Sequence, residues 1–297
     1  MINVIGRRKI FFVFSGLTIL LSLLSIILFS FHLGIDFKGG SLWQLRIPEK
    51  SEADVRNFFA SELGVSDMSV GRDPASSIYS LEFKEIKQAE RTSYFNTIKG
   101  KFSDKVEDLD FWALSPSVSS ELRDRAILAI VLVMVGISFY IAFAFRKVSR
   151  PISSWKYGVI TLLTLFHDVV IPAGVFAALG KVLGVPADIN FVVALLFVMG
   201  FSVHDTIVVF DRIRENLLTL RGRDSLENIV NVSVNQILGR SINTSLTLIL
   251  VLVALYFLGP LSLKYFILTI LIGTVTGAYS SIFIASPLLV VAQGKKG

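Results

Sequence analysis

The chain lacks cysteine altogether and has only three histidines among its 297 residues. Without cysteine it forms no disulfide bond and offers no thiol nucleophile. Charged residues are also scarce, at 18%, whereas hydrophobic residues make up 53% and phenylalanine alone occurs 24 times. One soluble domain of this length cannot hide so much apolar surface, and the mean hydropathy is +0.68. The composition therefore predicts an integral membrane protein.

Nucleotide-binding and catalytic motifs are missing too. The clusters Lys38-Gly39-Gly40 and Gly294-Lys295-Lys296-Gly297 lack the spacing of a phosphate-binding loop, which argues against ATP as the direct energy source. No G-x-S-x-G or H-E-x-x-H sequence occurs either. We therefore expect no enzymatic activity and no cofactor, and carboxylates inside the membrane remain the main candidates for chemistry.

Six apolar runs are long enough to cross about 30 Å of hydrocarbon. The expected fold class is therefore a polytopic α-helical membrane protein with six transmembrane helices. The first run exceeds the usual length of a signal-peptide core and no A-x-A site follows it, so we expect a retained anchor. The runs are residues 10–31, 126–145, 158–179, 189–210, 244–258 and 262–292.

Outside residues 33–125, basic residues flank these runs asymmetrically, and only Lys181 and Lys264 lie at the opposite ends. The positive-inside rule then places both termini and the second and fourth connections in the cytoplasm. Because no basic run is interleaved with aromatic residues, the net charge of +6 reports topology, and nucleic acid is not an expected partner. The basic residues at the predicted cytoplasmic ends are Arg7, Arg8, Lys9, Arg146, Lys147, Arg150, Lys156, Arg212, Arg214, Arg221, Arg223, Arg240, Lys295 and Lys296.

Residues 32–125 form the only sizeable soluble segment, which is predicted to lie outside the cytoplasm. Alternation of apolar and polar residues predicts its first strand, and Ser51 is a candidate cap for its first helix. The expected order is strand 41–47, helix 52–63, strands 68–70 and 78–83, helix 87–102 and strand 109–114. This is the order of a split β-α-β, ferredoxin-like α+β domain. The chain thus divides into a tail with helix 1 (1–31), the α+β domain (32–125) and helices 2–6 (126–297).

The connection 211–241 between the fourth and fifth runs carries apolar residues at helical spacing on both sides of Gly222. Two short amphipathic helices at the membrane surface would satisfy this pattern. The apolar residues are Ile213, Leu217, Leu220, Leu226, Ile229, Val230, Val234 and Ile237.

Two His-Asp pairs, His167-Asp168 and His204-Asp205, lie inside apolar runs, where ionisable groups are costly and usually mark ion routes. Neighbours on a helix point about 100° apart, so each His is expected to point away from its Asp, which disfavours a metal site. Two intramembrane aspartates are also found in aspartyl proteases. The sequence before Asp205, however, lacks the G-x-G-D pattern of those enzymes.

The two aspartates are distinguished by a candidate cationic partner. Arg240 lies at the start of the fifth run, at the cytoplasmic end towards which the fourth run leads. A carboxylate beside Arg240 stays ionised, and a separated, desolvated carboxylate takes up a proton. Asp205 is therefore the first candidate for ion coupling, with Arg240 as its switchable partner. Asp168 and His204 are lower candidates, because Asp168 is equally well explained as a hydrogen-bonding residue between helices.

Other small and polar residues predict architecture. Gly273, Gly277 and Ser281, with Ala285, repeat every four residues on the sixth run and form a stripe that lets another helix approach, within the chain or from a partner. Asp36, Gly39 and Gly40 follow the first run at the membrane edge. We expect the two glycines to make a tight turn into the soluble domain, and a hinge there is a hypothesis.

Three sequence motifs together carry a family resemblance. They are Gly34-Ile35-Asp36-Phe37-Lys38-Gly39-Gly40, Phe166-His167-Asp168, and the seventeen residues from Gly200 to Asn216 that contain Val203-His204-Asp205-Thr206. The chain resembles, over essentially its whole length, the SecF subunits of the bacterial SecD/SecF family within the resistance-nodulation-division superfamily. That resemblance implies a multi-pass protein of the bacterial inner membrane that uses the proton motive force to promote preprotein export on the outer side. It assigns ion coupling to Asp205 and Arg240.

The resemblance also implies partners: a SecD subunit with six further helices, the SecYEG translocon, YajC, unfolded preproteins and membrane lipid. Two alternatives remain open from the residues themselves. One is half of a small-molecule exporter of the same superfamily, and the other is a passive translocon assembly factor in which Asp205 and Arg240 tolerate neutral substitution. The residues leave the coupling ion, H⁺ or Na⁺, undecided.

Overall fold

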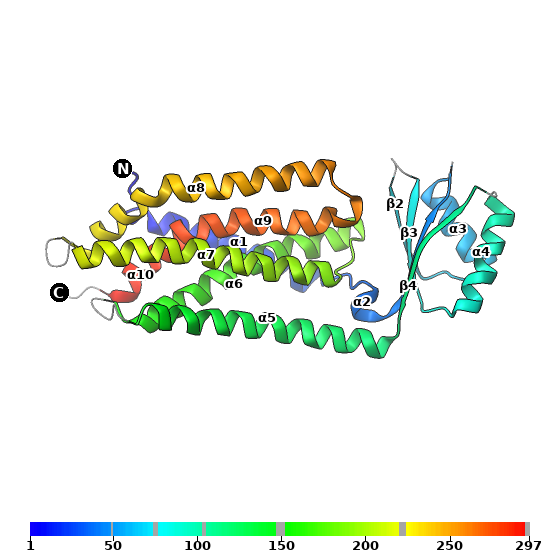
Figure 1. The fold of residues 1–297 in the computed structure, drawn as a ribbon, viewed down its shortest axis with the longest axis horizontal. Coiled ribbons are helices and arrows are strands. Elements are labelled where there is room, and N and C mark those ends of the chain that lie inside the picture. The colour runs from blue at the N-terminus through cyan, green and yellow to red at the C-terminus, as the bar shows by residue number, and fades with distance from the viewer. Residues whose placement is uncertain (49, 74–76, 103–104, 147–151, 220–223, 295–297) are drawn as a thin grey trace. The chain divides into compact units, whose positions relative to one another are not determined.

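The computed structural model describes residues 1–48, 50–73, 77–102, 105–146, 152–219 and 224–294. The chain forms two compact units, shown as a ribbon in Figure 1. We call the first the membrane unit, which comprises Met1–Phe31, Leu128–Val185 and Asn190–Gly297. We call the second the α+β unit, which comprises His32–Ile127 and Pro186–Ile189.

Six helices of the described residues are long and apolar enough to cross a membrane, as the six runs predict. The sixth follows a short 3-10 turn, η1 (Leu261–Leu263), and contains a π-helical segment, η2 (Ser281–Ala285), part-way along its length. The helices are α1 (Arg8–Phe29), α5 (Pro116–Ala144), α6 (Ser154–Leu183), α7 (Ile189–Thr219), α8 (Leu226–Leu258), and α9 (Lys264–Ser280) with α10 (Ser286–Gln293).

The centre of the membrane unit is formed by α6, α7 and the sixth helix, each with more than half of its most apolar stretch buried. α1, α5 and α8 instead leave large apolar side chains exposed, such as Ile27, Phe139 and Leu250. Such outward-facing residues are suited to contact with lipid tails. A polar group that is buried among these three helices, such as Asp168, is therefore shielded from both water and lipid.

The connection between α7 and α8 corrects one expectation. Its apolar residues do not form two separate surface helices, because α7 runs on to Thr219 and α8 already begins at Leu226. Ile213 and Val230 are completely buried in the main apolar core, and Asn216 of α7 donates to the Ser233 hydroxyl of α8 at 2.8 Å. The apolar stripe thus joins the two helix ends to each other. Gly222 and Leu220 lie outside the described residues, as do Lys147, Arg150, Arg221, Arg223, Lys295 and Lys296.

The α+β unit has the strand and helix order expected from the sequence. Its four-stranded antiparallel sheet has the order β2-β3-β1-β4, and α3 and α4 lie on the same face of it (Figure 1). The one-turn helix α2 (Ile35–Lys38) leads into the sheet. The remaining elements are β1 (Gly40–Arg46), α3 (Glu52–Glu62), β2 (Met68–Asp73), β3 (Ile78–Phe83), α4 (Gln88–Phe102) and β4 (Glu107–Leu114).

Local sequence explains this unit well. Trp43 and Leu45 of β1, and Ile47 just after it, alternate with less buried neighbours and are completely buried in the core beneath the helices. Ser51 caps α3: its hydroxyl accepts from the Asp54 N–H at 3.1 Å, and the Asp54 carboxylate accepts from the Ser51 N–H at 3.0 Å. This reciprocal capping box satisfies two otherwise unpaired donors.

The start of the α+β unit pairs with a distant part of the chain. The Gly34 N–H donates to the Ala187 carbonyl at 2.9 Å, and the Ala187 N–H donates to the His32 carbonyl at 2.6 Å. Pro186–Ile189, at the junction of α6 and α7, thereby belong to this unit, although the predicted boundaries 32–125 leave them out. α5 also begins ten residues before the apolar run at 126, because the polar turns after Pro116 are helical without being hydrophobic.

Candidate functional site

The most buried carboxylate of the membrane unit is Asp168 on α6, which has no exposed surface. Its Oδ1 accepts a hydrogen bond from Nδ1 of His167 at 2.7 Å. Its Oδ2 accepts from the hydroxyls of Ser202 on α7 at 2.5 Å and Ser280 on α9 at 2.7 Å. Asp168 therefore ties the three central helices together through one side chain.

The bond between His167 and Asp168 corrects the expectation that the two residues of a pair point apart. The Cα–Cβ bonds of helical neighbours do diverge, but an imidazole and a carboxylate are long enough to turn back towards each other over the same helix surface. His167 is only 2% exposed, and its Nε2 has no hydrogen-bond partner among the described residues. No group of three or more potential metal ligands occurs there or elsewhere in the described part of the chain.

Asp205 lies on α7 one turn after Ser202 and is 4% exposed. Its Oδ2 accepts from the hydroxyl of Ser245 on α8 at 3.3 Å, which is long for an O–H···O bond. Among the described residues, Asp205 thus has one weak hydrogen-bond partner, whereas Asp168 has three close ones. Its neighbour Thr206 contacts the hydroxyl of Ser281 at 3.0 Å, at the first residue of the π-helical segment η2.

Arg240 and His204, the other residues singled out from the sequence, are both exposed. Within the described residues Arg240 makes no ion pair, so the structure does not bring it onto Asp205. It does lie on the helix that supplies Ser245, five residues earlier, which corresponds to about 7.5 Å along the helix axis. Five residues also turn about 140° around the helix axis, and Arg240 is exposed whereas Ser245 is buried. Arg240 and Asp205 are therefore separated in this structure.

The small-residue stripe on the sixth helix packs inside the chain. A Cβ atom on Gly273 would lie 2.1 Å from Val198 Cγ2, and one on Gly277 would lie 3.1 Å from Ser202 Cβ. α7 therefore approaches α9 closely at these two glycines. Ser281 continues the stripe and donates to the Gly277 carbonyl at 2.9 Å.

Sequence reasoning missed the serines of this site: Ser202, Ser245 and Ser280. All three are buried at 3% exposure or less, and each donates to an aspartate. The signal was present, because hydroxyl residues inside apolar helices usually hydrogen-bond across helices. Their partners were not predictable, because that requires knowing which helices pack together.

The residues predicted for the turn after α1 form a connected group in the α+β unit. Gly39 and Gly40 have φ values of 81° and 135°, and a Cβ atom on Gly40 would lie 2.6 Å from the Phe83 carbonyl oxygen. Asp36 accepts a hydrogen bond from the Ile189 N–H at 2.9 Å. The backbone at Gly39 and Gly40 has the positive φ values that a tight turn uses, and Asp36 also bonds the first residue of α7.

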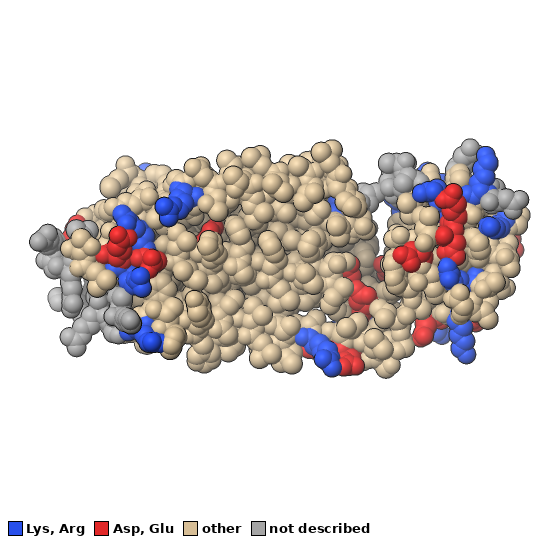
Figure 2. All heavy atoms as spheres, viewed as in Figure 1, with Lys and Arg blue, Asp and Glu red and all other residues tan. Residues whose placement is uncertain are grey.

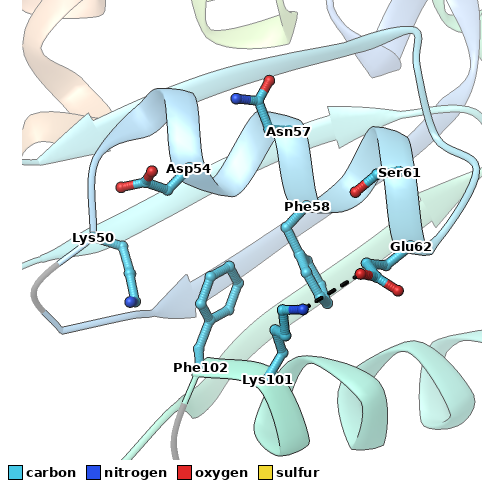
Figure 3. Close-up of a pocket in the computed structure, with 8 residues that line it drawn as sticks. All are labelled: Lys50, Asp54, Asn57, Phe58, Ser61, Glu62, Lys101 and Phe102. Atoms are coloured by element: carbon cyan, nitrogen blue, oxygen red, sulfur yellow. Dashed lines mark hydrogen bonds and ion pairs between the residues drawn. The ribbon is translucent and has the colours of Figure 1, made fainter.

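Pockets and charges add little to this site. One shallow pocket of ≈ 300 Å³ lies on the α+β unit between α3 and the end of α4, where Lys101 pairs with Glu62 across its edge (Figure 3). On the face seen in Figure 2, charged side chains concentrate near the ends of the helices of the membrane unit, and the stretch between is almost free of them. The buried aspartates are thus exceptional for their position.

The comparisons with known proteins agree with these observations. The family of protein export membrane proteins SecD/SecF, C-terminal, matches residues 94–295, which include Asp168, Asp205 and Arg240. The chain belongs to the SecD/SecF family. It is 45% identical to the protein translocase subunit SecF of Thermobaculum terrenum, over 99% of this chain and 95% of the relative. It is 36% identical to the SecF subunit of Anaerolinea thermophila, over 98% and 94%.

Solved structures give the same result. The crystal structure of SecDF, a translocon-associated membrane protein from Thermus thermophilus, superposes with a TM-score of 0.86 at 30% identity, covering 99% of this chain and 39% of that one. A second structure, of SecDF in a super-membrane-facing form, gives a TM-score of 0.67 at 31% identity, covering 98% and 38%. The chain thus spans about two-fifths of the solved SecDF chains, and protein translocation is the process of its family.

Proposed function

We propose that the chain is the SecF half of a SecDF-type complex that uses the proton motive force to promote preprotein export on the outer side of the bacterial inner membrane. The observation that carries this proposal is Asp205, a buried carboxylate in a membrane helix that has one weak hydrogen-bond partner in the described part of the chain. Such a residue is expensive to keep ionised and is therefore suited to binding and releasing a proton.

Arg240 supplies the other state of the switch. In this structure it is exposed and separated from Asp205, the arrangement in which the carboxylate takes up a proton. When Arg240 moves onto Asp205, the carboxylate ionises and releases that proton. A proton crossing the membrane supplies about 2.3 kcal/mol per 100 mV. This free energy changes the equilibrium ratio of two helix packings by about fifty-fold, which is enough to drive a cycle between them.

Exposed polar residues on α7 and α8 support a second membrane protein as partner. His204, Arg240 and Asn243 are exposed near the level of Asp205, where lipid tails would leave their hydrogen-bonding groups unsatisfied. A SecD subunit covering this face would satisfy them. The SecDF relatives, in which this chain matches about two-fifths of the length, supply such a second half.

The soluble unit is the element that we propose to act on the emerging preprotein. Its sheet order β2-β3-β1-β4 supports a ferredoxin-like fold, and the positive-inside rule supports its placement outside the cytoplasm with both termini inside. Asp36, Gly39 and Gly40 follow α1 in the chain, Asp36 accepts a hydrogen bond from Ile189 at the start of α7, and the two glycines act as the hinge. Movement of the helices is thereby transmitted to the soluble unit.

Co-purification tests the complex directly. The tagged full-length chain, extracted from its native membrane in a mild detergent, should recover SecD and SecYEG, with YajC as a further component. Asn243→Trp should reduce recovery of SecD, whereas Leu132→Trp, at a residue of α5 that is 60% exposed, should not. Recovery without SecD or SecYEG, together with saturable binding of hydrophobic drugs, would contradict the proposal in favour of a small-molecule exporter.

A further inference from the structure

A buried nitrogen atom remains unexplained by a switch that uses Asp205 alone. His167 Nε2 has no hydrogen-bond partner among the described residues, although the side chain is almost completely enclosed. A buried polar atom without a partner costs free energy, so its presence in the centre of the membrane unit calls for a role.

The partners of Asp168 determine the chemical form of this nitrogen. Oδ2 receives two hydroxyl donors and Oδ1 receives the imidazole, an arrangement that suits an ionised carboxylate accepting three hydrogen bonds. His167 then carries its proton on Nδ1, and Nε2 presents a lone pair. An orphan lone pair on an imidazole is a proton-binding position.

We propose that the His167–Asp168 pair binds a proton at His167 Nε2 and thereby gives the membrane unit a second proton-binding site besides Asp205. The inference rests on the proposed function, because it assumes that protons move through this unit. When the Nε2 lone pair takes up H⁺, the neutral imidazole becomes an imidazolium beside the Asp168 carboxylate. The net charge of the pair changes from −1 to zero, a change that a buried site favours.

The surroundings place this site beside the first one. The titratable groups facing His167 are Asp168 on its own helix and Tyr279 of α9, whose ring stacks on the imidazole with 6.1 Å between centroids. The Tyr279 hydroxyl contacts Ser15 of α1 at 3.1 Å. From α7, Asp205 lies within electrostatic range of Asp168. Two carboxylates in range disfavour each other's charge, so proton binding at one site influences the other.

The sixth helix offers a mechanical link between the two sites. Ser280 donates to Asp168, and the next residue, Ser281, contacts Thr206 beside Asp205. The π-helical segment η2 begins at Ser281. π-Bulges are frequent at functional sites. A change of charge at His167–Asp168 is thus transmitted through two adjacent serines to the turn that carries Asp205.

Nitrogen NMR tests the proposal on the full chain in lipid bilayers. With His32→Gln and His204→Gln, His167 is the only histidine, and ¹⁵N-histidine labelling reports its two nitrogens alone. We expect Nδ1 to be protonated throughout, and Nε2 to change from unprotonated to protonated as the sample is taken from alkaline to acidic pH. An Nε2 signal that does not change with pH, or a neutral form with the proton on Nε2, would overturn the proposal.

A matched variant links the site to activity. His167→Asn retains an N–H donor near the position of Nδ1 and removes Nε2. It should preserve expression and assembly but change the pH profile of potential-driven export, which a purely structural role would leave unchanged in shape. If Asp205→Asn leaves export unaffected while Nε2 still titrates, only the proposed function fails. If Asp205→Asn abolishes potential-driven export while Nε2 does not change its protonation, only this inference fails.

Discussion

Asp36 and Ile189 are 153 positions apart in the chain, yet the Asp36 carboxylate accepts the backbone N–H of Ile189 at 2.9 Å. Ile189 is the first residue of α7, so Asp36 satisfies a backbone N–H at the start of that helix. A carboxylate at this end also interacts favourably with the positive end of the helix dipole. The helix that carries Asp205 therefore begins on a residue of the motif that follows α1.

Removing this cap should loosen the start of α7. Asp36→Ala is expected to lower the free energy of local opening at the start of α7 by about 1 kcal/mol. Amide exchange of residues 187–190 then becomes about five-fold faster. Asp36→Asn keeps an acceptor and should show a smaller effect. Hydrogen exchange followed by mass spectrometry measures this, with Asp67→Ala, at an exposed aspartate, as the control. Equal exchange in Asp36→Ala and wild type would show that the bond is not made in the membrane.

Gly40 should tolerate no side chain. Its φ of 135° is unfavourable for other residues, and a Cβ atom would lie 2.6 Å from the Phe83 carbonyl oxygen. Gly40→Ala is expected to destabilise the chain by about 1–3 kcal/mol, measured by thermal unfolding in detergent. Gly71→Ala is the control, because its nearest atom would be 3.9 Å away. Gly40→Val should impair export without changing membrane insertion, and wild-type export in that variant would remove the hinge hypothesis.

Glu82 on β3 should make the stability of the α+β unit depend on pH. Burial, with Asp188 and Asp36 nearby, raises the pKa of Glu82 from 4.5 to about 7, although Lys38 opposes the shift. A raised carboxyl pKa favours folding at low pH, where the group is protonated in both states. This contribution, roughly 3 kcal/mol, is lost as the pH rises from about 4.5 through about 7.

The measurement is denaturant unfolding followed by the fluorescence of Trp43, which is completely buried in this unit, with Trp112 and Trp155 replaced by Phe. Glu82→Gln should flatten the pH dependence over this range. Glu85→Gln, at an exposed neighbour, should leave it unchanged. A wild-type unit whose stability increases between about pH 5 and about pH 7 would show the opposite sign and refute the assignment.

The contact between α7 and α9 should be sensitive to volume. A methyl group on Gly273 would overlap Val198, so Gly273→Ala is expected to cost about 1–3 kcal/mol in unfolding free energy. Gly200→Ala places its methyl in open space and serves as the control. Val198→Ala combined with Gly273→Ala should recover part of the loss, a coupling that a double-mutant cycle measures. Additive effects would mean that the two helices do not touch there.

The sequence predicts the elements of this chain better than their partners. Strand 78–83 and the Ser51 cap are found as expected, because alternation and capping involve only neighbouring residues. Hydropathy underestimates the lengths of α7 and α8. Their turns at the predicted cytoplasmic ends are helical but amphipathic, and the apolar sides of these turns are buried against each other.

The candidate site was only partly predictable for the same reason. Asp168 and Asp205 stand out as ionisable residues in apolar runs, whatever the tertiary structure. The donors to Asp168 come from residues 34 and 112 positions away, which no local pattern relates to it. The bond from His167 was missed because the helical periodicity of Cα atoms does not fix where a long side chain ends.

The most direct test of the account compares potential-driven export in Asp205→Asn and Asp211→Asn. Asp211 is an exposed residue of the same helix that pairs with Arg214, so it controls for the loss of a carboxylate. Export of a reporter preprotein is measured in cells with and without a protonophore, relative to cells that lack the chain. Asp205→Asn should assemble with its partners yet reduce the potential-dependent component to the level without the chain, whereas Asp211→Asn should keep it. An unchanged component in Asp205→Asn would contradict the account.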